Sequence, residues 1–111
     1  MDQVQKIAVK NNTGYVFKFS VKWQSSDGTW HITTKESDDY PTTQSRTLAL
    51  DEIGVPADAS AVTPYGHTVD PKLGHAQGTP CVTFAPNNRI ARYEATVTRE
   101  GVLIIVLEKN G

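Results

Sequence analysis

Hydrophobic and polar residues alternate along most of this chain, and the alternation is most regular between residues 15 and 24. On one face of an extended strand, this segment places Tyr15, Phe17, Phe19, Val21 and Trp23. On the other face, it places Val16, Lys18, Ser20 and Lys22. Successive side chains of a β-strand point to opposite faces. The pattern therefore predicts a strand whose apolar face forms one wall of a hydrophobic core.

The same period of two recurs in seven further segments, which are separated by turn-forming Asn, Asp and Gly residues. The predicted strands span residues 4–10, 29–34, 45–50, 61–65, 81–85, 90–99 and 102–107. The first three strands of the chain are expected to form a meander through turns at 11–14 and 25–28. In the third strand Trp30 shares a face with Ile32, so Trp30 is expected to point inward and His31 outward.

The sequence gives a more specific prediction for each of four segments. Pro64 cannot donate to a ladder, which predicts an edge strand or a bulge there. Residues 102–107 are apolar on both faces, which favours a central strand covered on both sides. Gly54 and Pro56 leave room for one helical turn within 51–60. Residues 66–79 form the longest stretch without periodicity, which is typical of a functional or mobile loop.

About eight short strands with frequent turn signals predict an all-β fold in a single domain spanning residues 1–111. We expect one antiparallel β-sandwich with an immunoglobulin-like or jelly-roll topology. The chain has no apolar run long enough to span a bilayer as a helix and no classical secretory signal at its start. The location predicted from these features is the cytoplasm, or the exterior by a route without a classical signal.

Composition narrows the function mainly by exclusion. The formal net charge is −1, from 11 basic and 12 acidic residues, so nucleic acid is not an expected partner. The single cysteine, Cys81, cannot form an internal disulfide and lies in an apolar strand, where a small buried side chain is its ordinary role. His67 and His75 lie eight residues apart, which matches no metal-binding spacing, so no metal or other cofactor is expected.

Catalytic patterns are missing from the sequence as well. No serine lies in a nucleophile-elbow context, and no glycine-rich segment leads into a helix that would cradle phosphate. The acidic pairs at 38–39 and 51–52 are sequence neighbours, whose side chains point apart on an extended chain. We therefore expect a protein that is not an enzyme and that binds its partner through loops on a rigid sheet.

Carbohydrate is the first ligand class predicted, because aromatic rings stack on sugars and polar side chains bond their hydroxyl groups. The stacking candidates are Trp30, Tyr40 and Tyr65. The hydrogen-bonding candidates are Asp27, His31, His67, Asn87 and Asn88. A small lectin of this kind would gain from forming a homo-oligomer, since multivalency multiplies weak single sites. A module for protein interaction or self-assembly, built on an unprotected edge strand, is a further alternative.

The opening segment "IAVKNNTGYVFKFSVKW" resembles the first strands of the aegerolysin and actinoporin families of small cytolysins. The resemblance covers about a fifth of the chain and implies a cysteine-poor β-sandwich that binds lipid or a membrane surface. This chain departs from the actinoporins in starting directly in a strand, without an amphipathic helix before it. No site residue is carried over from either family.

Overall fold

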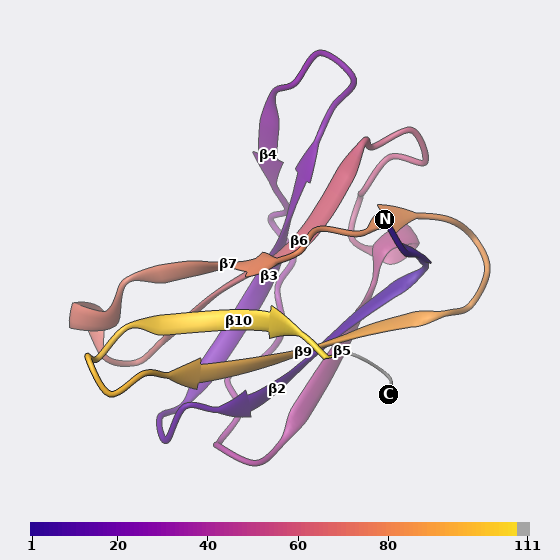
Figure 1. The fold of residues 1–111 in the computed structure, drawn as a ribbon. Helices are drawn as coiled ribbons and strands as arrows, with labels where there is room; N and C mark the ends of the chain where they lie inside the picture. The colour runs from indigo at the N-terminus through magenta and orange to yellow at the C-terminus, as the bar shows by residue number, and fades with distance from the viewer. Residues whose placement is uncertain (109–111) are drawn as a thin grey trace.

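The computed structural model describes residues 1–108, and nearly all of its regular structure is β-strand (Figure 1). This confirms the all-β class. The strands are β1 (Gln3–Val4), β2 (Lys6–Asn12), β3 (Phe17–Gln24), β4 (Trp30–Ile32), β5 (Ser45–Ala49), β6 (Ala61–Thr68), β7 (His75–Thr79), β8 (Thr83–Phe84), β9 (Ile90–Val97) and β10 (Leu103–Leu107). Two 3-10 turns interrupt them, η1 (Leu50–Glu52) and η2 (Pro71–Leu73).

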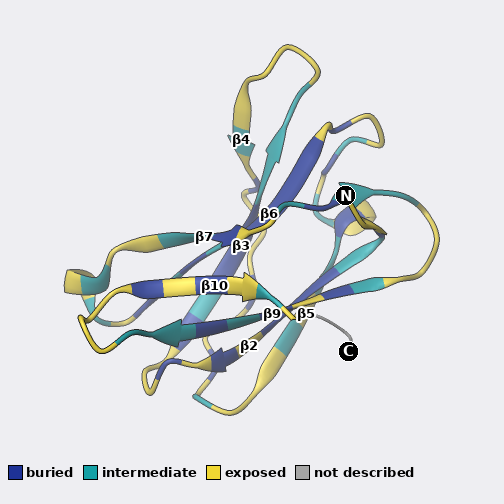
Figure 2. Ribbon diagram, viewed as in Figure 1, coloured by how far each residue is buried: buried dark blue, intermediate teal, exposed yellow. Residues whose placement is uncertain are grey.

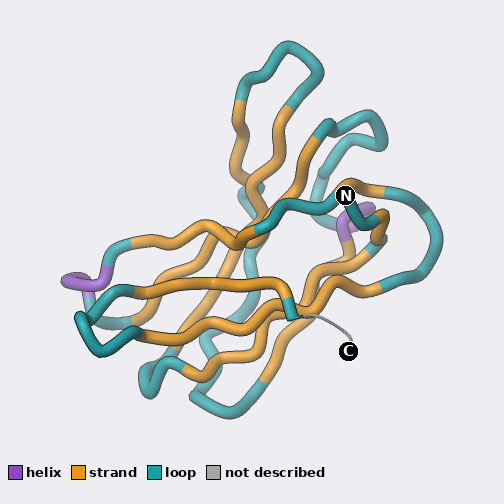
Figure 3. The backbone as a smooth tube through the Cα atoms, in the orientation of Figure 1, coloured by secondary structure: helices purple, strands orange, loops and turns teal. Residues whose placement is uncertain are grey.

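Eight of these strands form one sheet in the order β4-β3-β6-β7-β10-β9-β2-β5, and β1 pairs with β8 separately. The large sheet curls on itself, so the fold is a half-barrel and not the two-sheet sandwich that the sequence predicts (Figure 3). The pairing is also mixed, because β2 runs parallel to β9 and β7 parallel to β10. Alternation reports which side chains share a face, but it carries no information on which strands become neighbours.

The core lies on the concave side of the curled sheet, and Figure 2 shows buried residues recurring along most of the strands. Phe17, Phe19 and Val21 of β3 are buried there, as the alternation predicts. They pack in one cluster with buried residues of the other strands, among them Ile7, Val9, Val62, Tyr93 and Ile105. Removing apolar side chains of this size from water contributes about 1.5–3 kcal/mol each, and this burial is the main force that closes the half-barrel.

The predicted meander is only half correct. β3 and β4 form a hairpin around the turn at 25–28, but β2 and β3 are not neighbours in the sheet. The chain passes from β2 to β3 through residues 13–16 and changes from one side of the half-barrel to the other. β2 instead pairs with β9 and β5, which are distant in sequence.

β6 lies inside the sheet between β3 and β7, so the prediction that Pro64 marks an edge strand or a bulge is wrong. Pro64 pairs with Val21 of β3, whereas the ladder to β7 begins only at Tyr65. The missing N–H of Pro64 therefore interrupts no hydrogen bond to β7. Pro64 stands at the point where β7 leaves β6 and continues toward β10.

Three other segments differ, wholly or in part, from their predictions. β10 is central in the sheet, but Ile104 and Val106 on its convex face are 38% and 45% exposed, so only one face is covered. Most of 66–79 is ordered structure and not a long loop, because β6 extends to Thr68 and η2 and β7 follow. The single helical turn expected within 51–60 begins one residue earlier, as η1.

The side chains of β4 face opposite to the prediction. Trp23 pairs with His31 across the hairpin, and Trp23 packs against the core, so His31 lies on the concave side. Trp30 and Ile32 project from the convex side and are 38% and 51% exposed. The period of two is correct, but its phase in β4 is set by the turn length, which overrides the preference for burying the larger ring. At the start of the segment, Tyr15 precedes β3 and is exposed.

Candidate functional site

Three connecting segments lie together at one end of the half-barrel, and we call them the loop end: residues 13–16, 69–74 and 98–102 (Figure 1). Strand register fixes this arrangement. Asn12 at the end of β2 pairs with Thr96 near the end of β9, and Phe17 pairs with Thr68. β10 pairs with β7 in parallel register, so Val102 and His75, each three residues before the pair Ile105 and Gly78, lie at the same level.

The loop end exposes apolar side chains at its tips. Val69 is 63% exposed, Val102 54%, Tyr15 41% and Val16 37%. The backbone N–H of Val69 donates to the carbonyl of Val16 at 3.0 Å, so these two valines belong to one surface. Scattered surface hydrophobics are ordinary, but apolar residues gathered on adjacent loops indicate an interaction surface.

Hydrogen bonds, some of them buried, hold two of the three segments in place. Asn11 is fully buried, and its side-chain amide donates to the carbonyls of Tyr15 (2.7 Å) and Tyr40 (3.1 Å). Its side-chain oxygen accepts from the backbone N–H and the hydroxyl of Thr13. In the second segment the Asp70 carboxylate caps η2 by accepting from the backbone N–H of Lys72. The exposed side chains are therefore carried on ordered turns.

Two shallow depressions border Val69. One, of about 400 Å³, is lined by His67, Thr68, Val69, Asp70, Pro71, Gly74 and His75. The other, of about 210 Å³, is lined by Val16, Phe17, Lys18, Asp39, His67, Thr68 and Val69. His67 borders both, so it lies between the loop end and the convex face of the sheet.

A row of rings and one amine crosses the convex face over four neighbouring strands. We call it the outer row: Trp30, Lys22, Tyr65, His75 and His67. The amine of Lys22 lies 5.4 Å from the ring centroid of Trp30 and 5.4 Å from that of Tyr65, which is cation–π distance. It also donates to the side-chain oxygen of Gln77 at 3.2 Å.

The other half of the outer row consists of stacked rings. Tyr65 and His75 stack with their centroids 5.1 Å apart and a 15° angle between planes. His75 faces His67, which is its direct partner across the β6–β7 pair, with centroids 4.5 Å apart. Burial and the neighbouring charges of His75 and Lys18 lower the pKa of His67 below its ordinary value of 6.5. Protonation of His67 is therefore disfavoured in the folded protein.

Of the eight residues predicted to bind a ligand, the fold brings three together in the outer row: Trp30, Tyr65 and His67. His31 lies on the opposite side of the hairpin and stacks on Trp23 at 4.2 Å. Tyr40 is fully buried and donates its hydroxyl to the carbonyl of Val9 at 2.7 Å, so its ring is inaccessible to a ligand. Burial also raises the pKa of Tyr40.

The remaining three predicted residues shape turns. The carboxylate of Asp27 accepts from the hydroxyl of Ser25 and from the backbone N–H of Thr29, and these bonds lower its pKa to about 2. Asn87 and Asn88 lie in the turn before β9, beside the N-terminus and at the opposite end from the loop end. Asn87 donates to the carbonyl of Gln3, and Asn88 adopts the left-handed conformation with φ 60°.

Sequence reasoning missed Lys22, His75, Val69 and Val102 as members of these surfaces. Val69 carries a usable signal, because it is an apolar residue in a polar segment with no partner in the alternation. Val102 carries none, because the sequence places it in the predicted strand 102–107. Lys22 and His75 carry none, since their positions beside Tyr65 depend on strands that pair only in the folded sheet.

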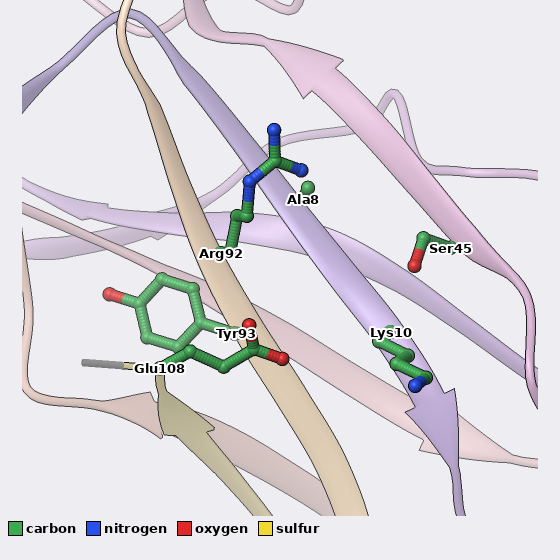
Figure 4. Close-up of a pocket in the computed structure, with 6 residues that line it drawn as sticks. All are labelled: Ala8, Lys10, Ser45, Arg92, Tyr93 and Glu108. Atoms are coloured by element: carbon green, nitrogen blue, oxygen red, sulfur yellow. The ribbon is translucent and has the colours of Figure 1, made fainter. Parts of the chain in front are cut away.

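A third depression, of about 210 Å³, lies over β2 and β9 and is lined by Ala8, Lys10, Ser45, Arg92, Tyr93 and Glu108 (Figure 4). Basic and acidic side chains border it together.

Elsewhere, burial raises the pKa of the Cys81 thiol, which disfavours the reactive thiolate at neutral pH. Within residues 1–108, no group of three or more His, Cys, Asp and Glu side chains is placed to hold a metal ion. In the same range, neither helical turn is long or apolar enough to cross a membrane.

These features define the class: an all-β half-barrel with an apolar loop end and an aromatic row on its convex face. The fold is similar to the NMR structure of a protein from Eubacterium rectale, with a TM-score of 0.55 and 12% identity over 96% of this chain and 89% of that one. No family model and no curated protein matches this chain.

Two cytolysin structures are also similar at lower scores. The crystal structure of listeriolysin O matches 96% of this chain with a TM-score of 0.45 and 14% identity, and this chain spans 22% of its length. The membrane-binding domain of pneumolysin matches over 96% of both chains, with a TM-score of 0.43 and 12% identity.

Proposed function

We propose that this protein is a non-catalytic binding module that attaches to lipid membrane surfaces through the loop end. The observation that carries the proposal is the gathering of four exposed apolar side chains, Tyr15, Val16, Val69 and Val102, on three turns at one end of the sheet. This favours lipid over carbohydrate, because Val69 and Val102, two of the most exposed apolar side chains, lie on turns at one end of the molecule together with Tyr15 and Val16.

The energetics fit weak, reversible attachment. Each half-exposed side chain that leaves water for the lipid interface contributes about 1 kcal/mol. Tyrosine suits this position because its ring is apolar and its hydroxyl stays in water. Attachment of this strength localises a protein at a membrane only while several side chains insert together.

The charged residues of the loop end are expected to contribute little to membrane attachment. Lys72 and Arg99 lie there with Asp70 and Glu100, two charges of each sign. Attraction to anionic lipid requires a surplus of basic residues near the surface. The proposed attachment is therefore driven by apolar insertion and does not require anionic lipid.

Co-sedimentation with neutral phosphatidylcholine vesicles tests the proposal. The test variant combines Tyr15→Ser, Val69→Ser and Val102→Ser. It removes one exposed apolar side chain from each of the three turns. The matched control is Ile32→Ser, which removes a side chain that is 51% exposed on the convex face of β4, away from the loop end. We expect the triple variant to bind roughly a hundredfold more weakly, from about 1 kcal/mol per side chain, and the control to bind as the parent does.

Two results would contradict this proposal. In the first, the parent protein stays in the supernatant with every vesicle composition tried. In the second, the parent binds, but the triple variant binds equally well, which would place the contact elsewhere on the molecule.

Carbohydrate binding is the second candidate, and the outer row favours it. Trp30 is exposed beside Lys22, and the amine of Lys22 contacts Gln77, so an aromatic face lies next to an amine that could bond hydroxyl groups, with an amide beyond it. A glycan array comparing the parent with Trp30→Ala tests it. Specific signals that Trp30→Ala abolishes would support this candidate, and an array without signal at high protein concentration would remove it.

A further inference from the structure

His67 and His75 form a cross-strand pair that the sequence spacing does not reveal. They are direct partners in the antiparallel ladder between β6 and β7. Side chains opposite one another in such a ladder have Cβ atoms about 4.5–5.5 Å apart. Their ring centroids are 4.5 Å apart with 45° between the planes, so the two imidazoles are already in contact.

The surroundings of the pair leave it accessible and keep it in place. Both rings line the depression of about 400 Å³, which has room for water molecules beside them. Tyr65 stacks on His75 with a 15° angle between planes, which restricts that ring from the other side. Lys18 is the ladder partner of His67 on β3, and its amine is paired with Glu36 at 3.0 Å.

We propose that His67 and His75 together bind one divalent transition-metal ion, such as Ni²⁺, Zn²⁺ or Cu²⁺, with water completing the coordination. Imidazole nitrogen is a preferred ligand for these ions, whereas Mg²⁺ and Ca²⁺ prefer oxygen. With two protein ligands the ion keeps open positions toward the depression. This is an exposed, exchangeable site, and it does not depend on the membrane-binding proposal.

The geometry supports the same assignment. The two imidazoles are in contact and line one depression, so an ion that enters it can meet a nitrogen from each ring. Metal binding requires neutral imidazole, so protons compete with the metal for both rings. The bound ion would also bridge β6 and β7, so metal binding is coupled to the folded state.

The test is titration of the metal-free protein with Ni²⁺ at neutral pH, followed by calorimetry and by the thermal midpoint Tm. The variants are His67→Gln and His75→Gln. The third histidine supplies the matched control, His31→Gln, because it stacks on Trp23 on the other side of the sheet. We expect saturable 1:1 binding and a metal-dependent rise in Tm. Binding should weaken by about tenfold or more in either test variant and stay unchanged in His31→Gln.

A second measurement requires no variant. Ni²⁺ is paramagnetic, so it should broaden the NMR signals of His67, His75 and Tyr65 before those of His31. The proposal is overturned if the parent shows no saturable binding, if His67→Gln and His75→Gln bind as the parent does, or if the broadening centres on another part of the chain.

Discussion

The backbone N–H of Val69 donates to the carbonyl of Val16 at 3.0 Å, and this bond joins two of the three turns of the loop end. The side chains of both valines are exposed, at 63% and 37%. A backbone bond between exposed apolar residues gives the surface a fixed shape, because neither turn can move without breaking it. The proposed membrane attachment would therefore need no prior ordering of these turns, which would reduce its entropic cost.

Salt should have little effect on attachment to neutral vesicles. The loop end carries balanced charge from Lys72, Arg99, Asp70 and Glu100, so screening removes no net attraction. We expect the bound fraction in co-sedimentation to stay constant or rise slightly as sodium chloride is increased. Release of the protein by salt would show that electrostatic attraction, not apolar insertion, holds it on the vesicle.

Asn11 should be one of the least replaceable polar residues. Asn11→Ala removes the amide that satisfies the carbonyls of Tyr15 and Tyr40 and the oxygen that accepts from Thr13. Leaving such groups buried without partners costs about 2–4 kcal/mol in the free energy of unfolding. Urea denaturation measures it, with the exposed neighbour Asn12→Ala as a control expected to change stability little. Equal effects of the two changes would mean that the buried network contributes nothing.

Gly66 is required because the ring of Phe17 occupies the space of a side chain there. A Cβ at residue 66 would lie 2.3 Å from Cζ of Phe17, far inside van der Waals contact. Gly66→Ala should therefore lower the free energy of unfolding by about 1–3 kcal/mol. Combining it with Phe17→Leu tests the cause, because the shorter side chain removes the clash. The two costs should then sum to more than the cost of the double variant.

The two rings of the β3–β4 hairpin on opposite faces should differ in their effect on stability. His31 stacks on the partly buried Trp23, whereas Trp30 projects from the convex face. His31→Ala should cost about 0.5–1.5 kcal/mol through the lost stacking. Trp30→Ala should cost less, although it removes the larger ring. Urea denaturation measures both costs. A larger loss in the free energy of unfolding for Trp30→Ala than for His31→Ala would contradict the outward orientation of Trp30 and favour the inward one that alternation predicts.

Stability should fall on acidification, with a contribution from His67. Its pKa in the folded protein is lowered by burial, by His75 and by Lys18, so the unfolded chain binds more protons near the ordinary value of 6.5. The stability from keeping His67 neutral is fully present above pH 6.5 and is lost as the pH falls through the lower folded value. The Tm of the metal-free parent and of His67→Gln, measured from roughly pH 8 to pH 5, checks this. The variant should lose less Tm over this range, and an identical slope would contradict the prediction.

Local chemistry explains what was predictable. The strand at Phe17–Gln24 and its buried face follow from alternation, and the turn at Ser25 to Gly28 follows from residue types that tolerate turn geometry. Residue type makes Trp30, Tyr65 and Tyr40 stacking candidates alike, yet Trp30 is exposed and Tyr40 is fully buried. Residue type alone cannot separate these cases, since burial depends on packing against distant residues such as Val9.

By itself, the sequence determined an all-β chain, the apolar face of β3, the hairpin to β4 and the positions of most turns, because these depend on residues that are close along the chain. Only the tertiary structure decided that the sheet is a half-barrel, that β2 pairs with β9, that Pro64 lies in an interior strand, and that Val16 meets Val69. The contact between His67 and His75 belongs to the same group. Each of these depends on register and curvature, which are set by burial of the whole core and not by any local pattern.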